Sequence, residues 1–201
     1  MARLSNTGED HNTFGGYASG SSKNSSVTCR NGDSTSSGGW KVLAINGNQV
    51  SIVHAGIPEC YFYSSYQSNS NIAATLNERA SVYKNNFAAS ARMLNESDVT
   101  NLAQDSALRK INAYYYLATP STESKGMKFI TTSGRLTQGG ENAQGVRPVI
   151  ILREDVRTTG QSNGAWVLTF EATKNNSDMQ LTTTGKIGDL FNFVKDTVDN
   201  S

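Results

Sequence analysis

Few residues in this chain could carry chemistry, and they form no recognisable catalytic or metal-binding motif. The histidines are His11 and His54, and no Cys-x-x-Cys spacing accompanies them, so we expect no metal site. A catalytic serine acting with His54 would be marked by a Gly-x-Ser-x-Gly elbow, which the sequence lacks. Glu59 and Glu78 form no obvious pair for glycoside hydrolysis. We therefore predict a non-enzymatic protein without a cofactor, in which His54 is structural or partly exposed.

The two cysteines, Cys29 and Cys60, are a further chemical feature. In an oxidising compartment they would pair, and closing a loop of this length is worth roughly 3–4 kcal/mol in the chain-entropy model. Cys29 lies in a Gly/Ser-rich stretch that would otherwise be costly to order. We therefore favour a Cys29–Cys60 disulfide, with two unrelated thiols as the alternative.

Composition narrows the class of protein. The hydrophobic fraction is 36% and the charged fraction 17%, both below the average for globular domains. The formal net charge is +1 and Lys and Arg form no dense cluster, which argues against a nucleic-acid partner. No apolar run approaches the roughly 18 residues of a membrane span, and Met1 leads into polar sequence without a signal peptide. Two interpretations remain open: a cytosolic protein, or an extracellular one whose anchoring segment has been removed.

Two β-hairpins are predicted from turn residues between short apolar runs. Residues 40–45 and 49–54 flank Asn46-Gly47, a step that favours positive φ. Residues 127–132 and 135–137 flank Ser133-Gly134 in the same way. Further strands are expected at residues 114–117, 146–152 and 165–170. Pro148 indicates that residues 146–152 form an edge or a bulged strand.

Helical spacing appears in three places. The first apolar face predicts a helix over residues 70–87, capped by Ser70 or Asn71, and consists of Ile72, Leu76, Ala80, Tyr83 and Phe87. A second helix is expected to begin at Asn95, where Leu94 and Val99 have the spacing of a hydrophobic staple. A C-terminal amphipathic helix, which would pack on the domain or dock to a partner, is predicted from Ile187, Leu190, Phe191, Val194 and Val198.

These elements predict an α+β fold, in which two helices pack on a twisted antiparallel sheet with long loops. Residues 1–38 would form a polar, loop-rich N-terminal segment and residues 39–170 the main domain. Residues 171–201 would be a C-terminal extension that carries the amphipathic helix.

Five ordered segments resemble a domain of bacterial surface proteins, mostly of Firmicutes, many of which carry an N-terminal prepilin-type helix. The segments are residues 39–43, 54–61, 89–94, 115–120 and 145–150. The last two, Tyr115-Tyr116-Leu-Ala-Thr-Pro and Gly-Val-Arg147-Pro-Val, also resemble the wider C-type-lectin-like group. The aromatic pair lacks the Trp that is usual in that group, and the copper-binding cysteines of its formylglycine-generating enzymes have no counterpart here.

The resemblance implies a C-type-lectin-like fold and the soluble part of a type IV pilin-like subunit or an adhesin, at the cell surface or outside the cell. The alternative is a phage-borne or secreted receptor-binding module of the same fold. The expected partner is a protein or glycan on a cell surface, or other fibre subunits. Contact with a membrane would occur only through a removed N-terminal helix.

Candidate site residues follow from this resemblance and from residue type. The polar stretches 119–127 and 138–144 would display the ligand surface, and the residues to test first are Tyr114, Arg135, Glu141 and Asn142. Packing of Tyr114 in the core is the alternative for that residue. Structural roles are expected for Trp40, Arg92 and Arg147. Because a buried unpaired charge is costly, we expect Arg147 to bond backbone carbonyls or a carboxylate.

Overall fold

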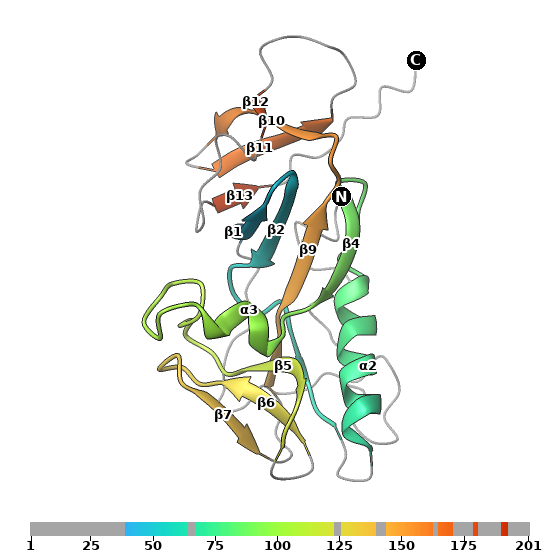
Figure 1. The fold of residues 1–201 in the computed structure, drawn as a ribbon, viewed down its shortest axis with the longest axis vertical. Helices are drawn as coiled ribbons and strands as arrows, with labels where there is room; N and C mark the ends of the chain where they lie inside the picture. Colours follow the sequence, from blue (N-terminus) through green and yellow to red (C-terminus); the bar gives the residue numbers. More distant parts are fainter. Residues whose placement is uncertain are drawn as a thin grey trace.

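The computed structural model describes residues 39–63, 67–122, 126–139, 144–162, 165–170, 179–180 and 190–192. Thirteen strands and two helices lie in this part of the chain. The strands form one sheet of eight and one of five. In Figure 1 the eight-stranded sheet occupies the upper part of the molecule and the five-stranded sheet the lower part, beside helix α2.

The eight-stranded sheet joins segments from distant parts of the chain. Its order is β12 (Met179–Gln180), β10 (Val156–Ser162), β11 (Ala165–Phe170), β13 (Leu190–Asn192), β1 (Trp40–Asn46), β2 (Gln49–His54), β9 (Pro148–Leu152) and β4 (Ala88–Met93). Neighbouring strands are antiparallel except β11 and β13. The first described strand, β1, therefore pairs directly with the last, β13.

The five-stranded sheet carries the segments that the sequence analysis associated with binding. Its order is β3 (Glu59–Tyr61), β8 (Gln144–Val146), β5 (Tyr115–Pro120), β6 (Met127–Ile130) and β7 (Leu136–Gly139). Only β5 and β8 are parallel among these pairs.

Of the two predicted helix N-caps, that of the first helix is wrong and that of the second is confirmed. Helix α2 (Asn69–Ser81) is capped by Ser68, whose side chain accepts from the backbone N–H of Asn71, so neither Ser70 nor Asn71 is the cap. Helix α3 (Glu96–Thr100) begins after Asn95 as predicted, and Asn95 forms a capping box with Asp98.

Helix α2 is shorter than the apolar spacing predicted. Ile72, Leu76 and Ala80 are buried from the helix, whereas Tyr83 and Phe87 are buried from the segment that follows it. There the side-chain oxygen of Asn85 accepts from the backbone N–H of Phe87 at 2.9 Å. Asn competes for backbone hydrogen bonds in this way, which ends a helix although the apolar spacing continues.

The fold class predicted from the sequence is wrong, because the molecule is β-rich rather than an α+β, C-type-lectin-like fold with three helices. Strands β3, β4, β10 and β12 lie where no strand was predicted. The sequence signal is weak there: β4 reads Ala-Ala-Ser-Ala-Arg-Met and has no β-branched or aromatic residue. Pairing with β9, which supplies the hydrogen bonds, decides its conformation.

The predicted C-terminal helix is also contradicted where the structure describes it. Leu190–Asn192 forms strand β13, which pairs with β1 on one side and β11 on the other. Ile187, Val194 and Val198 lie outside the described residues. Apolar spacing over a short segment does not exclude a strand, and here two neighbouring strands satisfy its backbone.

Both predicted hairpins are confirmed. Strands β1 and β2 pair up to Asn46 and Gln49, so that Gly47, at φ 59°, is the first of two turn residues. Strands β6 and β7 pair up to Ile130 and Leu136, and Gly134 adopts φ 79° in their turn. Positive φ explains why glycine occupies these two positions.

The segment around Arg147 crosses from one sheet to the other. Strand β8 ends at Val146 in the five-stranded sheet, and β9 begins at Pro148 in the eight-stranded sheet. We expected an edge or a bulged position for this segment. The edge position is wrong, since β9 lies between β2 and β4, and the pairing of β9 with β4 is irregular between Ala88 and Ser90. Pro148 is tolerated because it is the first residue of the strand, where a missing N–H costs least.

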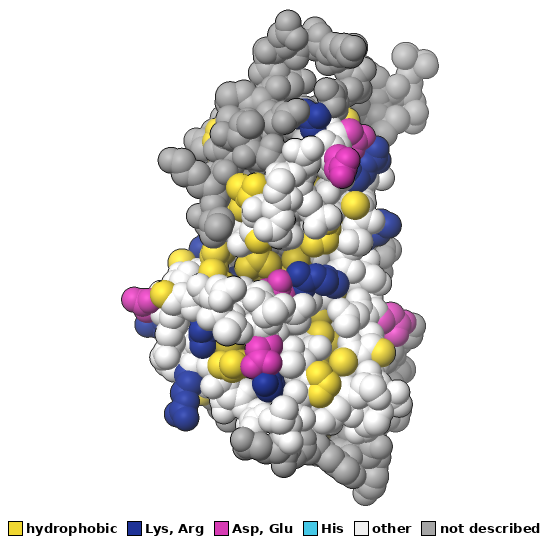
Figure 2. All heavy atoms as spheres, in the orientation of Figure 1, with side chains coloured by type: hydrophobic (Ala, Val, Ile, Leu, Met, Phe, Trp, Pro, Cys, Tyr) yellow, Lys and Arg dark blue, Asp and Glu magenta, His cyan; other side chains and the backbone are white. Residues whose placement is uncertain are grey.

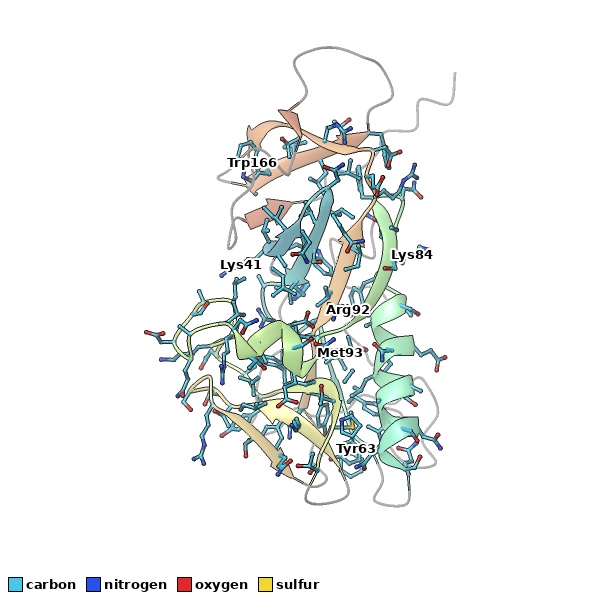
Figure 3. The ribbon with its side chains drawn as sticks, in the orientation of Figure 1. Lys41, Tyr63, Lys84, Arg92, Met93 and Trp166 are labelled. Carbon is cyan, nitrogen blue, oxygen red and sulfur yellow. The ribbon has the colours of Figure 1, made fainter. Side chains whose placement is uncertain are left out.

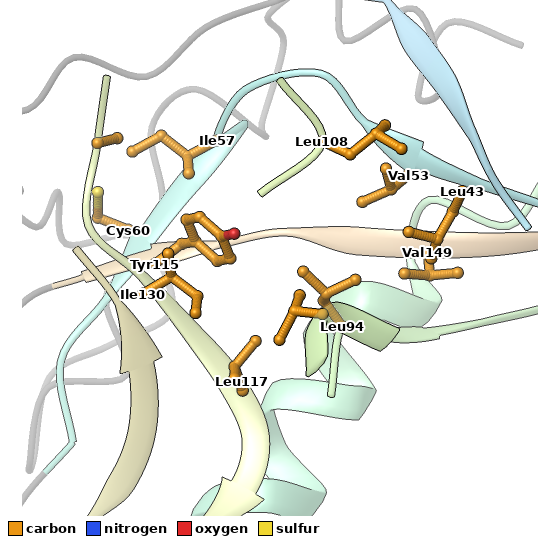
Figure 4. Packing of buried hydrophobic residues seen from close by; sticks show 12 residues of the cluster. Leu43, Val53, Ile57, Cys60, Leu94, Leu108, Tyr115, Leu117, Ile130 and Val149 are labelled. Carbon is orange, nitrogen blue, oxygen red and sulfur yellow. The ribbon is translucent and has the colours of Figure 1, made fainter. Parts of the chain in front are cut away.

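Three clusters of buried side chains form the core. The first lies on the eight-stranded sheet, with Trp40, Ile52 and Phe87 among its members. The second joins the two sheets near α3 and includes Val53, Val149 and Tyr115 (Figure 4). The third lies under α2, where Leu76 packs with Tyr61 and Tyr116. No helix in the described part of the chain is long and apolar enough to cross a membrane.

The two hairpin glycines offer a matched test of this packing. A Cβ at Gly134 would lie 1.9 Å from the backbone oxygen of Gln104, whereas at Gly47 it would meet nothing within 4 Å. Gly47→Ala should lower the free energy of unfolding by about 1 kcal/mol through backbone strain alone. Gly134→Ala should cost about twice as much or more, because the clash adds to the strain. Urea unfolding of both variants measures the difference, and equal losses would contradict the packing at Gly134.

Candidate functional site

Three connections of the chain meet at one end of the five-stranded sheet, through the hydroxyl of Tyr63. This hydroxyl donates to the backbone oxygen of Gly139 at the end of β7, at 3.1 Å. It also accepts from the backbone N–H of Met127 at the start of β6, at 3.4 Å. Tyr63 itself follows β3 and is buried. Figure 3 shows it beside α2 in the lower part of the molecule.

Gln138 makes a second link between the same connections. Its side-chain oxygen accepts from the hydroxyl of Ser121 at 3.1 Å and from the backbone N–H of Thr122 at 3.2 Å. The hydroxyl of Thr122 lies 3.3 Å from the same oxygen. The β5–β6 connection is therefore bonded to the end of β7 before either loop leaves the sheet.

Gly126 belongs to the same group of contacts, because its backbone lies very close to neighbouring segments. Its N–H donates to the side-chain oxygen of Asn69, in the first turn of α2, at 2.8 Å. A Cβ at Gly126 would lie 2.4 Å from the oxygen of Gly139 and 2.6 Å from the hydroxyl of Tyr63. Only glycine fits there without movement of the neighbouring backbone. We call this set the loop end; it consists of Tyr63, Asn69, Ser121, Thr122, Gly126, Gln138 and Gly139.

Gln144, at the start of β8, carries an unusual buried amide. The residue is 1% exposed, and within the described chain neither its side-chain oxygen nor its side-chain nitrogen has a hydrogen-bond partner. Its Cα partner in the sheet is Tyr61. Buried amides are nearly always hydrogen-bonded, so this one leaves a donor and an acceptor for water or for a ligand group.

The structure does not gather the four predicted ligand residues into one described site. Arg135 is exposed, but it lies in the β6–β7 turn, at the opposite end of that hairpin from Gly139. Tyr114 is half-buried, and its ring lies 6.3 Å from that of Phe129. Glu141 and Asn142 lie outside the described residues, in the stretch between Gly139 and Gln144. Gln138 begins the predicted polar stretch 138–144, but nothing in the sequence indicated that it links the two connections, and Tyr63 was not among the predicted site residues because it lies in no motif.

Arg147 is a charged residue in the interior of the protein. It is fully buried, and its Nε donates to the backbone oxygen of His54 at 2.9 Å, while Nη1 donates to that of Leu108 at 2.5 Å. Its guanidinium lies over the ring of Tyr115 at 4.9 Å. No carboxylate in the described part of the chain pairs with it. Burial lowers the pKa of Arg147 and raises that of Tyr115. We expected Arg147 to bond either backbone carbonyls or a carboxylate, and its hydrogen-bond partners are backbone carbonyls.

His54 is a core residue. It is fully buried, packs edge-on against Trp40 at 5.2 Å, and its Nδ1 accepts from the backbone N–H of Gly56 at 3.2 Å. Burial lowers the pKa of His54 to about 4, with a smaller contribution from the charge of Arg147. Trp40 is also fully buried and contacts Tyr83 at 6.4 Å.

A buried ion pair that the sequence analysis did not anticipate joins β3 to α2. Arg79 donates to both carboxylate oxygens of Glu59, at 3.1 and 2.6 Å, and both residues are buried. The guanidinium also lies over the ring of Tyr61 at 5.1 Å. Burial raises the pKa of Glu59 to about 7, because desolvation exceeds the attraction of Arg79. The pair fixes the helix on the sheet.

Arg92 is half-buried and forms a bidentate pair with Asp98, at 2.6 and 2.7 Å. The same carboxylate accepts from the backbone N–H of Asn95 at 2.8 Å. A partly exposed pair of this kind contributes little by itself, so its effect is to hold the start of α3. Figure 2 shows that charged side chains of both signs are scattered over the visible face.

Cys60 is disulfide-bonded and belongs to the second core cluster. Cys29, its predicted partner, lies outside the described residues. Among the described residues, no three His, Cys, Asp or Glu side chains are close enough together to hold a metal ion.

Comparison with protein-family models, with curated proteins and with solved structures finds no match.

Removal of Arg147 should destabilise the protein strongly. Arg147→Ala removes two charge-assisted hydrogen bonds and leaves the oxygens of His54 and Leu108 unsatisfied, so we expect a loss of about 3 kcal/mol or more. Urea unfolding and the melting temperature measure it. Arg153→Ala is the matched control, because Arg153 is 46% exposed and pairs with Asp155; its effect should stay within about 0.5 kcal/mol. An unchanged melting temperature for Arg147→Ala would show that Arg147 is not an anchor.

Because of His54, the free energy of unfolding should decrease as the pH falls. With its pKa lowered from 6.5 to about 4, folded His54 stays neutral between these values while the unfolded chain binds a proton. The free energy of unfolding should therefore decrease as pH falls through this range, by about 1 kcal/mol per pH unit. Glu59 acts in the opposite direction, since its raised pKa makes the folded state bind a proton between pH 4.5 and about 7.

Comparison with a variant isolates the His54 contribution. Unfolding by urea at several pH values should show that His54→Gln lacks this acid loss relative to the unmodified chain. If the two proteins had parallel pH profiles, His54 would not be held neutral in the folded state.

Proposed function

We propose that this is a non-enzymatic binding protein of the bacterial cell surface, a pilin-like subunit or an adhesin, and that it binds through the loop end. The observation that carries the proposal is the bonding of separate connections to one another by Tyr63 and Gln138. Fixing the ends of binding segments reduces the conformational entropy that is lost on binding, which raises affinity. The fold itself names no ligand.

The chemistry around the loop end favours a polar ligand. Ser121 and Thr122 lie beside the side chain of Gln138, and the unbonded amide of Gln144 begins the next strand. Glu141 and Asn142 lie between Gly139 and Gln144 in the sequence. Hydroxyl, amide and carboxylate groups suit the hydroxyls of a glycan or the polar surface of a protein.

An extracellular location is supported by two features. Cys60 is disulfide-bonded, and such bonds persist in oxidising environments. The charged fraction is only 17%, with Ser, Thr and Asn abundant instead, as on many extracellular β-rich domains. The ordered motifs that resemble Firmicutes surface proteins support the bacterial origin.

Binding of labelled protein to a glycan microarray and to intact bacterial and epithelial cells tests the proposal. The double variant Glu141→Ala/Asn142→Ala should lose binding about tenfold or more, as expected for central interface residues. Gln138→Ala should weaken binding by a smaller factor, because it loosens the loops without removing a ligand contact. Arg135→Ala and Tyr114→Phe test the two remaining predicted ligand residues.

Lys84→Ala is the matched control, since Lys84 is exposed and lies in the upper half of the molecule, away from Tyr63 (Figure 3). Binding to bacterial cells alone would favour the alternative of a phage-borne or secreted receptor-binding module. Binding that Lys84→Ala weakens as much as the loop variants do, or no binding to any of these surfaces, would contradict a role for the loop end.

A further inference from the structure

Strand β13 lies inside the eight-stranded sheet, between strands that belong to two different parts of it. On one side Leu190 and Phe191 are the Cα partners of Lys41 and Trp40 in β1. On the other side Phe191 and Asn192 are the partners of Trp166 and Val167 in β11. In the described sheet, β13 is the strand through which β10, β11 and β12 connect to β1, β2, β9 and β4.

The strands that flank β13 are held by contacts that do not involve it. Strand β1 pairs with β2 from Trp40↔His54 to Asn46↔Gln49. Strand β11 pairs with β10, and Leu168 of β11 is buried in the first core cluster. The ring of Phe170, at the end of β11, stacks on that of Phe87 at 4.6 Å. Strands β1 and β11, the two walls of the slot, therefore each have a second pairing or packing contact that does not depend on β13.

Strand β13 itself is held weakly by comparison. It has three residues and two Cα partners on each side. Its departure would expose the unpaired edges of β1 and β11, and free edges readily accept a strand from another molecule. The sequence known to fit this slot is Leu190–Asn192, which every copy of the chain carries.

We propose that β13 is exchanged between molecules, so that Leu190–Asn192 of one copy fills the slot between β1 and β11 of a second copy. Exchange of an identical strand keeps the same pairings, so its cost is low and its extent depends on protein concentration. This inference deepens the proposed role as a fibre subunit and in that respect rests on it. Strand exchange would supply the contact between neighbouring subunits.

Cross-linking between separately labelled chains tests the exchange. Full-length Lys41→Cys and Leu190→Cys chains are mixed in equal amounts and treated with a short bis-maleimide, and the adduct is identified by mass spectrometry. Because positions 41 and 190 are on different chains, adducts beyond those from chance encounters require β13 of one molecule to lie beside β1 of the other. When both chains are made about tenfold more concentrated, the initial rate of adduct formation should rise about hundredfold, which is about tenfold per chain, as mass action requires for a step that joins two molecules. Val167→Cys with Asn192→Cys repeats the test at the other wall of the slot.

Lys84→Cys mixed with Leu190→Cys is the control pair, because Lys84 is exposed and belongs to no strand of this slot. Circular dichroism of each variant establishes that it is folded, and light scattering of the unmodified chain must show dimers or larger species that grow with concentration. Adducts at 41–190 or 167–192 in excess of the control support exchange. Adducts no greater than the control, with an unmodified chain that stays monomeric, overturn it. Exchange leaves the loop end unchanged, so ligand binding and exchange can fail separately.

Discussion

The burial of one guanidinium, that of Arg147, is the constraint on which the joining of the two sheets depends. Arg147 occupies the single position between β8 and β9, where the chain passes from one sheet to the other. Its hydrogen bonds to His54 and Leu108 connect the end of β2 and the segment before β5 to this crossing point. A buried charge must be satisfied locally, so these three segments are obliged to converge there.

The buried pair of Arg79 and Glu59 has a different effect on the structure from that of Arg147. Arg79 and Glu59 are hydrogen-bonded to each other and hold α2 against β3, whereas Arg147 relies on carbonyls and the face of Tyr115. Helix α2 in turn places Asn69 where it accepts from Gly126 at the loop end. The position of the candidate binding loops is thus connected, through the helix, to an ion pair in the core. Polar groups buried in this way favour one arrangement of the elements, since alternatives would leave a charge unpaired.

The proposed ligand site and the proposed site of strand exchange lie on different sheets. The loop end belongs to the five-stranded sheet, and the slot filled by β13 belongs to the eight-stranded sheet. Figure 1 shows them toward opposite ends of the long axis. A subunit that binds with one end and contacts its neighbour with the other could present its ligand site repeatedly along a fibre.

The sequence by itself determined the features that depend on neighbouring residues. Both hairpin turns and the capping box at Asn95 were predictable, because positive φ and side-chain capping are local preferences. The tertiary structure alone decided that residues 190–192 form a strand and that β4 is a strand at all. In these segments the hydrogen-bond partners come from distant parts of the chain. The polar stretches 119–127 and 138–144 of the loop end were predictable from composition, but not their link through Tyr63, since Tyr63 and Gly139 are far apart in sequence and only the fold brings them within hydrogen-bonding distance.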